Sequence, residues 1–279
     1  FVTSPAQSQE AAPAVQFKQK LDVGKTYKYR QDMEMTMALP IGGAGDSKTK
    51  MSMDVSMAVA AAPDGDNKVV STSFDRIKME MNMAGQQMIY DSTDETKQNP
   101  LLKTAFGGLG EKSFKAIYDK DDRFVKMAEG GAGGSALAGM GMGEKEIEQM
   151  LKQLTDYGFP ARPVKPGEKW DHTQKASMGQ MGEMEMDMQF TYKGPAEHDG
   201  KKVEEVLFTG TVGGEAKEAG EELVSFKDSK MTGKMYFDTE LGTIRHSVVD
   251  MELTMAVGGA GGAEMDTSTR STYTLIGVE

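Results

Sequence analysis

The sequence contains no cysteine and no excess of basic residues. Without cysteine the chain has no disulfides, no thiolate metal ligands and no cysteine nucleophile. Its 32 lysines and arginines are outnumbered by 43 aspartates and glutamates, which gives a formal net charge of -11. Nucleic acids and anionic membrane surfaces repel such a chain, so we expect no nucleic-acid partner. There is also no apolar run of about 18 residues, so no transmembrane segment is expected.

The sequence also lacks the motifs that mark common catalytic and cofactor sites. It has no HExxH, no GxSxG, no Walker loop and no GxGxxG after a predicted strand. His172, His198 and His246 are dispersed, and no two of them have the spacing of metal ligands. Most carboxylates alternate with methionine on the wet faces of predicted strands, whereas a catalytic acid pair needs a desolvated member. We therefore predict a protein that is not an enzyme and has no cofactor or metal site.

Strict alternation of apolar and polar residues is the clearest pattern in the chain. It extends over residues 33–39, 51–59, 77–83, 184–192 and 249–257. A period of two places successive side chains on opposite faces of a β-strand, so each segment has one apolar face and one wet face. This pattern is typical of an antiparallel sheet that is covered on one side. Clusters of Pro, Asp, Asn and Gly at residues 63–67, 119–122, 195–200 and 238–242 predict the hairpin turns between strands.

An internal repeat relates the two ends of the chain. Residues 24–27 (GKTY) match residues 167–170 (GEKW), and residues 51–54 (MSMD) match residues 184–187 (MEMD). Residues 117–119 likewise match residues 236–238, and the first copy carries a glycine-rich insertion around residues 39–48. We therefore predict a mainly β fold with a long, curved, half-barrel-like antiparallel sheet, built from two related β-meanders with one amphipathic helix.

Four parts of the chain are expected. Residues 1–16, rich in Ala, Gln, Ser and Pro, predict a disordered tether of the kind left after a signal peptide is removed. The first meander is predicted over residues 17–128, a glycine-rich linker and helix over 129–159, and the second meander over 160–279. The two meanders form either two domains or one continuous sheet. The amphipathic helix is expected over residues 144–157, and Asn99-Pro100 starts a second, short helix.

Methionine is unusually frequent, with 24 residues against thirteen leucines. One interpretation is a dry core, because the unbranched methionine side chain fills irregular gaps. Another is a deformable apolar surface that repacks around a lipid or acyl chain. The predicted ligand cavity is lined by the methionines of the alternating segments: Met33, Met35, Met37, Met51, Met53, Met57, Met79, Met81, Met83, Met184, Met186, Met188, Met251 and Met255.

A third interpretation of the methionines is binding of Cu(I), which favours thioether ligands. Residues i and i+2 of one strand lie about 6.7 Å apart, so the sulfur atoms would need a cross-strand partner or a flexible backbone. Residues 140–142 and 178–188 are the places where flexible backbone would bring sulfurs together.

Residues 157–170 (YGFPARPVKPGEKW) contain the pattern F-P-x-x-P-V-x-x-G-x-x-W. This pattern resembles the centre of an uncharacterised family of exported bacterial β-rich proteins, a domain of unknown function. Residues 24–29 and 233–242 share the resemblance, which implies export to the periplasm or cell surface. It also implies an architecture similar to the periplasmic lipoprotein-carrier half-barrels, without catalytic residues. Tyr27 and Trp170, at equivalent repeat positions, are expected to anchor the starts of their strands to the core.

The leading hypothesis is thus a noncatalytic exported protein that binds lipid or another apolar ligand in a Met-lined concave sheet. The main alternative is a structural or envelope-interaction protein with a dry Met-rich core. Cu(I) binding by thioethers is the minority alternative.

Overall fold

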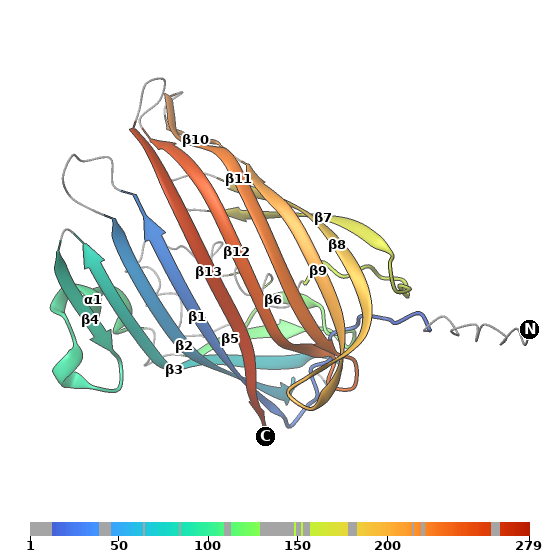
Figure 1. The fold of residues 1–279 in the computed structure, drawn as a ribbon. Coiled ribbons are helices and arrows are strands. Elements are labelled where there is room, and N and C mark those ends of the chain that lie inside the picture. Colours follow the sequence, from blue (N-terminus) through green and yellow to red (C-terminus); the bar gives the residue numbers. More distant parts are fainter. Residues whose placement is uncertain are drawn as a thin grey trace, which may run out of the picture.

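Thirteen strands and two short helical segments make up the described structure (Figure 1). The computed structural model describes residues 13–38, 46–63, 65–83, 85–108, 113–128, 148, 152, 157–177, 183–213, 215–218, 221–257 and 263–279. The first half contains β1 (Thr26–Met37), β2 (Ser47–Ala61), β3 (Lys68–Met83), β4 (Gln86–Asp91), η1 (Glu95–Lys97), α1 (Pro100–Phe106), β5 (Ser113–Tyr118) and β6 (Phe124–Met127). The second half contains β7 (Lys169–Ser177), β8 (Glu183–His198), β9 (Lys201–Gly213), β10 (Glu215–Glu218), β11 (Glu221–Asp238), β12 (Thr243–Val257) and β13 (Ala263–Val278).

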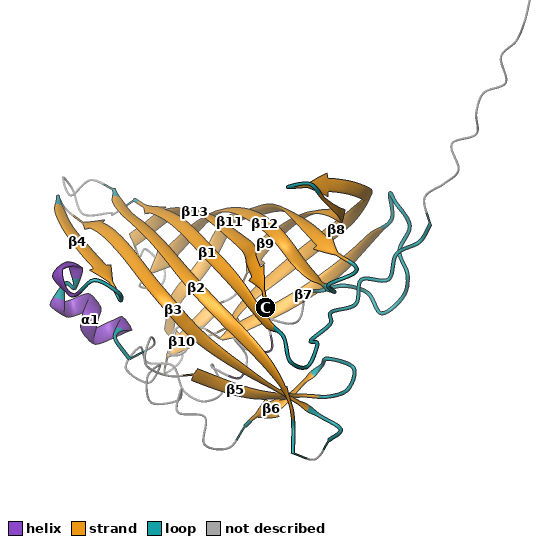
Figure 2. Ribbon diagram, turned by 90° about the horizontal axis from the view of Figure 1, so that it is seen from below, coloured by secondary structure: helices purple, strands orange, loops and turns teal. Residues whose placement is uncertain are grey.

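All thirteen strands belong to one open antiparallel sheet, which confirms the predicted fold class. The order is β6-β5-β3-β2-β1-β13-β12-β11-β9-β8-β7, with β4 beside β3 and β10 beside β11. The sheet curves strongly, so that β5 and β6 lie across from β11, β12 and β13 (Figure 2). The curvature gives the sheet an inner, concave face and an outer, convex face.

The two halves meet where β1 pairs with β13. The pairing runs from Tyr27 opposite Val278 to Met37 opposite Thr267. At its end, Thr26 and Glu279 exchange two backbone hydrogen bonds of 2.9 and 3.0 Å. Each half has its own cluster of buried apolar residues, and Tyr273 packs against both clusters. The halves thus share one sheet while each keeps a core of its own; the residue boundaries of the domains stay a prediction.

The segment before β1 packs against the second half of the protein. Residues 1–12 of the predicted tether lie outside the described residues. Val15 exchanges two backbone hydrogen bonds of 2.8 Å with Val164, and the buried Phe17 ring stacks on Phe159 at 4.8 Å between centroids. Packed structure therefore begins within the stretch that we assigned to the tether.

Equivalent hydrogen bonds support the internal repeat. Gly24 donates its N–H to the carbonyl of Val59 at 2.9 Å, and Gly167 donates to the carbonyl of Tyr192 at 2.7 Å. Both glycines have φ of +88°, a left-handed conformation that favours glycine. The pairs Val59–Lys25 and Tyr192–Glu168 complete the same pattern in the two halves. The turn at residues 24–27 is thus built like the turn at residues 167–170.

The two predicted helices have different outcomes. The short one is confirmed as α1, where Asn99 caps the helix by accepting hydrogen bonds from the N–H groups of Leu101 and Leu102. The longer one, over residues 144–157, lies almost entirely outside the described residues; Glu148 and Lys152 are helical and exposed. In the part of the chain that the structure describes, no helix has the length and apolar character needed to cross a membrane.

The turns follow the sequence signals with one correction. Asp238 confirms the turn before β12, because its carboxylate accepts hydrogen bonds of 2.9 Å from the N–H groups of Glu240 and Leu241. The turn predicted over residues 195–200 is wrong in its extent, since β8 continues to His198 and leaves Asp199 and Gly200 as the turn. A bulge beside Gly194 accommodates the proline within the strand.

A bulge in β3 divides the pairing of that strand between two partners. Val55 of β2 pairs with Phe74 and Asp54 pairs with Arg76, so Asp75 is the extra residue. On one side of the bulge β3 pairs with β5, and on the other side it pairs with β4. The strand therefore supports the edge of the sheet that ends in β6 and also the β4–α1 insertion.

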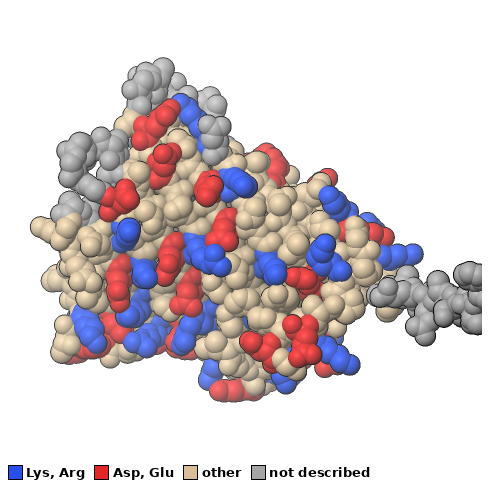
Figure 3. All heavy atoms as spheres, in the orientation of Figure 1, with Lys and Arg blue, Asp and Glu red and all other residues tan. Residues whose placement is uncertain are grey.

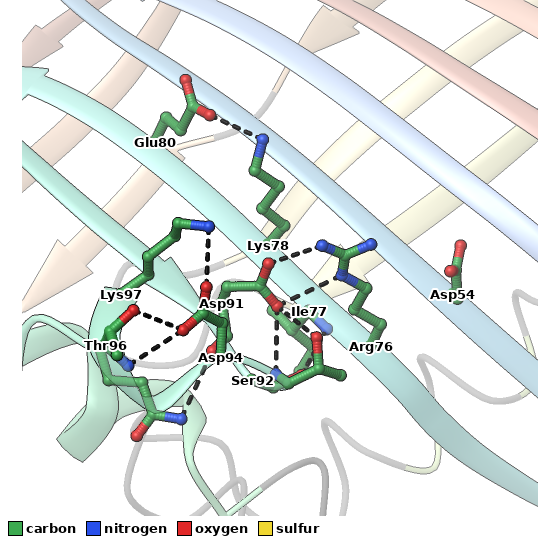
Figure 4. A network of polar contacts seen from close by, with 12 residues as sticks. Asp54, Arg76, Ile77, Lys78, Glu80, Asp91, Ser92, Asp94, Thr96 and Lys97 are labelled. Carbon is green, nitrogen blue, oxygen red and sulfur yellow. Dashed lines mark hydrogen bonds and ion pairs between the residues drawn. The ribbon is translucent and has the colours of Figure 1, made fainter.

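An ion pair holds β4 against β3 (Figure 4). The Arg76 guanidinium donates to both oxygens of the buried Asp91 carboxylate, with Nη2–Oδ2 at 2.6 Å and Nε–Oδ1 at 3.3 Å. Arg76, helped by hydrogen bonds from Thr93, holds the pKa of Asp91 well below its usual range despite burial. The carboxylate therefore stays ionised near neutral pH.

Candidate ligand-binding face

The predicted ligand-binding methionines lie in five strands, β1, β2, β3, β8 and β12. They occupy the same alternate positions as the buried residues of those strands, which define the inner face. Met83 is part of β3, but its side chain lies outside what the structure describes. Their role in ligand binding stays a prediction.

The outer face carries charges of both signs instead (Figure 3). Lys50 of β2 forms an ion pair with Glu34 of β1, and Arg30 forms a two-point ion pair with Asp54. Successive positions of one strand thus present methionine inward and a charge outward, as the alternation in the sequence requires.

Cross-strand pairing places methionines side by side within the first half. Met33 lies opposite Met51, and Met51 lies opposite Met79. Side chains directly opposite one another in an antiparallel pair have Cβ atoms about 4.5–5.5 Å apart, so their thioethers are neighbours. Met81 lies opposite Met88 of β4 and extends this methionine surface toward α1.

A second row crosses from the first half to the second. Met35 lies opposite Thr269, which lies opposite Met251 of β12. Met251 lies opposite Met231 of β11. Met231 lies opposite Gly210, and Gly210 lies opposite Met188 of β8. The row therefore forms a continuous band on the inner face across β1, β13, β12, β11, β9 and β8.

Burial divides these methionines into two classes that alternation alone does not distinguish. Met57 and Met79 are 5% exposed and belong to the core of the first half. Five of the others, Met51, Met53, Met81, Met186 and Met188, are partly buried and pack against the two cores. The remaining described ones are also half-buried: Met33, Met35, Met37, Met184, Met251 and Met255. The predicted set thus combines core residues with a partly accessible apolar surface.

A tyrosine pair underlies this surface where the halves meet. The rings of Tyr29 and Tyr273 stack at 4.7 Å between centroids, and the Tyr29 hydroxyl is 2.8 Å from the Thr243 hydroxyl. Burial raises the pKa of Tyr29, Tyr273 and the nearby Tyr157 above the usual value. All three side chains are therefore neutral near pH 7, which suits contact with an apolar ligand.

The second half contains an aromatic cluster that our sequence interpretation did not identify as a unit. Trp170 stacks on Phe190 at 5.4 Å with an interplanar angle of 7°, and its indole N–H donates to the Gly158 carbonyl at 2.9 Å. Phe190 contacts Phe208. The positions of Tyr27, 1% exposed, and of Trp170 fit the expected role of anchoring the starts of β1 and β7.

A pocket of about 730 Å³ lies beside this cluster. Three segments line it, residues 16–19, residues 121–124 and residues 157–161, together with Lys152. Phe17, Phe124 and Phe159 provide its aromatic lining, and Lys18 and Asp121 form an ion pair of 3.6 Å. These segments are far apart in the sequence, which is why no local motif indicated the pocket.

Two of the three dispersed histidines stack on each other in the structure. The His198 and His246 rings are 4.8 Å apart, and His198 also stacks on Tyr236 at 4.4 Å. Burial, and then the neighbouring His198, lower the pKa of His246. Within the described ranges, no group of three or more His, Cys, Asp or Glu side chains is arranged to hold a metal ion.

Comparison with solved structures shows a similarity of fold to part of lipovitellin. A structure of lipovitellin that addresses lipid–protein interactions superposes with a TM-score of 0.53 at 9% identity, over 93% of this chain and 26% of that chain. The chain thus spans about a quarter of the length of that relative, and the likeness concerns the fold. A Bacteroides fragilis protein with a YmcC-like fold, described as a candidate exported protein, gives a TM-score of 0.33 at 11% identity, over 96% and 100% of the two chains.

Sequence comparison finds similarity to one family model, over a shorter part of the chain. The model of a family of unknown function (DUF6263) matches residues 65–121, from the turn before β3 to the turn after β5. Similarity to a family of unknown function is thus confirmed, through a different stretch from the one around residues 157–170. No protein with a curated description matches the sequence.

Proposed function

We propose that this protein binds a lipid or another elongated apolar ligand against the inner face of its sheet, without catalysing a reaction. The proposal depends on one observation, the inner-face row that continues from Met35 across β13 to Met251 and Met188, three methionines that are each half-buried. A soluble protein rarely leaves a large apolar surface accessible unless something binds there. Methionine suits this use because its flexible, polarisable side chain adapts to ligands of different shape.

Two further features support the proposal. The tyrosines beneath the band are neutral, so they place no charge against an acyl chain bound there. The curved sheet also resembles the fold of lipovitellin, for which lipid–protein interactions are described. That likeness is one of fold and carries no residue-level correspondence.

Titration of the delipidated protein with dansyl-labelled undecanoic acid tests the proposal. We expect saturable binding that Met35→Gln and Met251→Gln each weaken about tenfold, because a polar amide replaces an apolar contact worth about 1.4 kcal/mol. Glu34→Gln and Glu252→Gln are matched controls, since they introduce the same residue one position away on the outer face. These two controls should bind the probe normally.

Two outcomes would contradict the proposal. One is the absence of saturable probe binding by the unaltered protein, which would favour the structural alternative with a dry core. The other is equal binding by the inner-face and outer-face variants, with folding of each verified by circular dichroism. Native mass spectrometry of protein purified from its own host provides an independent test, because bound lipid adds mass.

Cu(I) binding is a second candidate function, and the register of the strands favours it at one place. Met33, Met51 and Met79 lie opposite one another on three neighbouring strands, and this supplies the cross-strand partners that a thioether site requires. Titration with Cu(I) against a competing chelator under reducing conditions tests it. Tight binding at one equivalent, abolished by Met51→Leu, is the expected result for such a site.

We also propose that the protein is exported to the periplasm or cell surface. The resemblance carried by residues 157–170 and the lack of cysteine, which fits an oxidising compartment, support this location. Fractionation of the native host, followed by immunoblotting, tests it; recovery in the cytoplasmic fraction would contradict it.

A further inference from the structure

Three methionines of β1 have unusual neighbours on the inner face. These β1 methionines, Met33, Met35 and Met37, are all half-buried. On β13, each of them lies opposite a residue that carries a hydroxyl group: Ser271, Thr269 and Thr267, respectively. We call these residues the β13 hydroxyls. A surface built only to contact hydrocarbon has no need of hydroxyl groups beside its sulfur atoms.

Hydroxyl groups also flank the β1 methionines on the side of β2. Met35 lies opposite Thr49, and Met37 lies opposite Ser47. Thr49 and Ser47 are 5% and 8% exposed. Met35 and Met37 are therefore each enclosed between two hydroxyl-bearing residues from the neighbouring strands.

One of the β13 hydroxyls is an unsatisfied donor. Thr267 is 7% exposed, and its Oγ1 has no hydrogen-bond partner among the described residues. Buried hydroxyl groups nearly always have a partner, because an unpaired one loses its hydrogen bond to water. Thr267 lies directly opposite Met37, whose thioether sulfur is only a weak acceptor. A sulfoxide oxygen in place of that thioether would be a far stronger acceptor.

We propose that the β1 methionines form a reversible oxidation site, in which the sulfoxide oxygens accept hydrogen bonds from the β13 hydroxyls, and that this oxidation releases the bound apolar ligand. The release rests on the proposed function. The oxidant is hydrogen peroxide: the sulfur lone pair attacks one oxygen and the O–O bond breaks. The proton of the attacked oxygen passes to the departing hydroxide, which leaves as water. Sulfur loses two electrons and the peroxide gains them. Each oxidation changes a flexible apolar side chain into a polar one.

Two groups of methionines in this chain should differ in how fast they are oxidised. It has no cysteine, so the thioethers are its only sulfur groups. Met57, Met79, Met231 and Met235 are 4–6% exposed within the two cores. A peroxide in solution reaches the β1 methionines more readily than these buried ones, so oxidation should begin on the ligand-binding face and leave the cores intact.

Timed treatment of the purified full chain with hydrogen peroxide, followed by peptide mapping, tests the site. We expect the β1 methionines to oxidise at least tenfold faster than the four buried methionines. Reduction by methionine sulfoxide reductases of both stereospecificities should restore the original masses. Equal oxidation of the two groups, or unfolding at the first oxidation, would overturn the site.

Binding of dansyl-labelled undecanoic acid tests the release. Oxidation should lower the affinity for this probe about tenfold, and enzymatic reduction should restore it. A variant with all three β1 methionines changed to leucine should have the same probe affinity before and after peroxide treatment, whatever that affinity is, whereas a Met57→Leu variant should still lose affinity in peroxide. Probe affinity that survives oxidation of the β1 methionines would overturn the release, while a failure to bind probe before oxidation would overturn the proposed function itself.

The role of the β13 hydroxyls is tested separately, by thermal unfolding. A variant with Thr267→Val, Thr269→Val and Ser271→Ala should have an unchanged melting temperature when reduced and a lower one than the unaltered protein when oxidised. Equal melting temperatures of the two oxidised proteins would show that the β13 hydroxyls do not donate hydrogen bonds to the sulfoxides.

Discussion

Met57 and Val59 in the first half of the sheet occupy the same repeat positions as Phe190 and Tyr192 in the second half. The equivalence follows from the matched hydrogen bonds of Gly24 with Val59 and of Gly167 with Tyr192. Met57 lies opposite Tyr27 and Thr72, in a core that methionines of β2, β3 and β4 share with aromatic residues. Phe190 instead stacks on Trp170 and contacts Phe208. One backbone pattern therefore supports two different kinds of packing.

The difference suggests a division of labour between the halves. Aromatic rings have few rotamers and pack in defined orientations, so they fix the second half and the segment around Phe17. Methionine packing specifies a structure less strongly but tolerates rearrangement. We interpret the aromatic packing around Phe190 as the rigid support, and the methionine rows of the first half as the adaptable part of the candidate ligand-binding face.

Truncation at these two equivalent positions should change the unfolding free energy more than the other substitutions below. Phe190→Ala should cost about 3–5 kcal/mol of unfolding free energy, because it removes a ring that stacks on Trp170 and contacts Phe208. Met57→Ala should cost less, about 2–3 kcal/mol, since it removes a smaller, flexible side chain that takes part in no ring stack. Urea unfolding followed by circular dichroism measures both. A larger loss for Met57→Ala would contradict the rigid-support interpretation.

A glycine in the second half offers a smaller perturbation of the aromatic packing. A Cβ atom at Gly233 would lie 2.1 Å from Cζ of Phe208, which covers this glycine from the neighbouring strand. Gly233→Ala should therefore cost about 1–3 kcal/mol. Gly213→Ala is the matched control, because nothing lies within 4 Å of its Cβ position. Equal melting temperatures for the two variants would show that the ring moves aside freely.

Acid should affect the first half through Asp91. Arg76 lowers the pKa of this carboxylate in the folded protein. The stabilisation that the ionised carboxylate provides is therefore present above its pKa in the unfolded chain, about 3.9, and is lost as the pH falls toward the folded pKa. Asp91→Asn should cost about 1–3 kcal/mol at pH 7 and progressively less below pH 4. Urea unfolding at pH 7 and at pH 3 measures the change, and a cost independent of pH would contradict the ion-pair explanation.

The smallest effect is expected on the outer face. Lys50 and Glu34 form an ion pair of 2.9 Å in which both side chains are more than 60% exposed. Lys50→Gln should change the unfolding free energy by less than about 0.5 kcal/mol, because solvent screens such pairs. Thermal unfolding at low and high salt checks this, and a loss comparable to that of Met57→Ala would assign the outer face a structural role.

Much of the fold follows from local patterns in the sequence. Alternation predicts the strands and their apolar faces, and the repeat predicts that the turn before β1 is built like the turn before β7. The pairing of β1 with β13 could not be predicted, since it joins segments more than 200 residues apart and any two long amphipathic strands satisfy its pattern. The packing of Phe17 against Phe159 and Phe237 was missed for the same reason.

The candidate site was predictable in composition but not in accessibility. Alternation identifies Met35 and Met57 equally as inner-face residues. In the structure, however, Met35 is half-buried and Met57 belongs to the core. That difference depends on the curvature of the sheet and on what packs against each strand, which no local pattern specifies. The β13 hydroxyls beside the β1 methionines depend on register, and so does the stack of His198 on His246.

The central position of β13 has a consequence for how the chain folds. Pairings within each half are local and can form early, but β1 and β12 each keep an exposed edge until residues 263–278 are available to insert between them. Until then the protein consists of two partial sheets with unpaired strands, a state that is prone to aggregate. Loss of this last strand would therefore divide the sheet at its middle, whereas the loss of β6 or β7 would only shorten it.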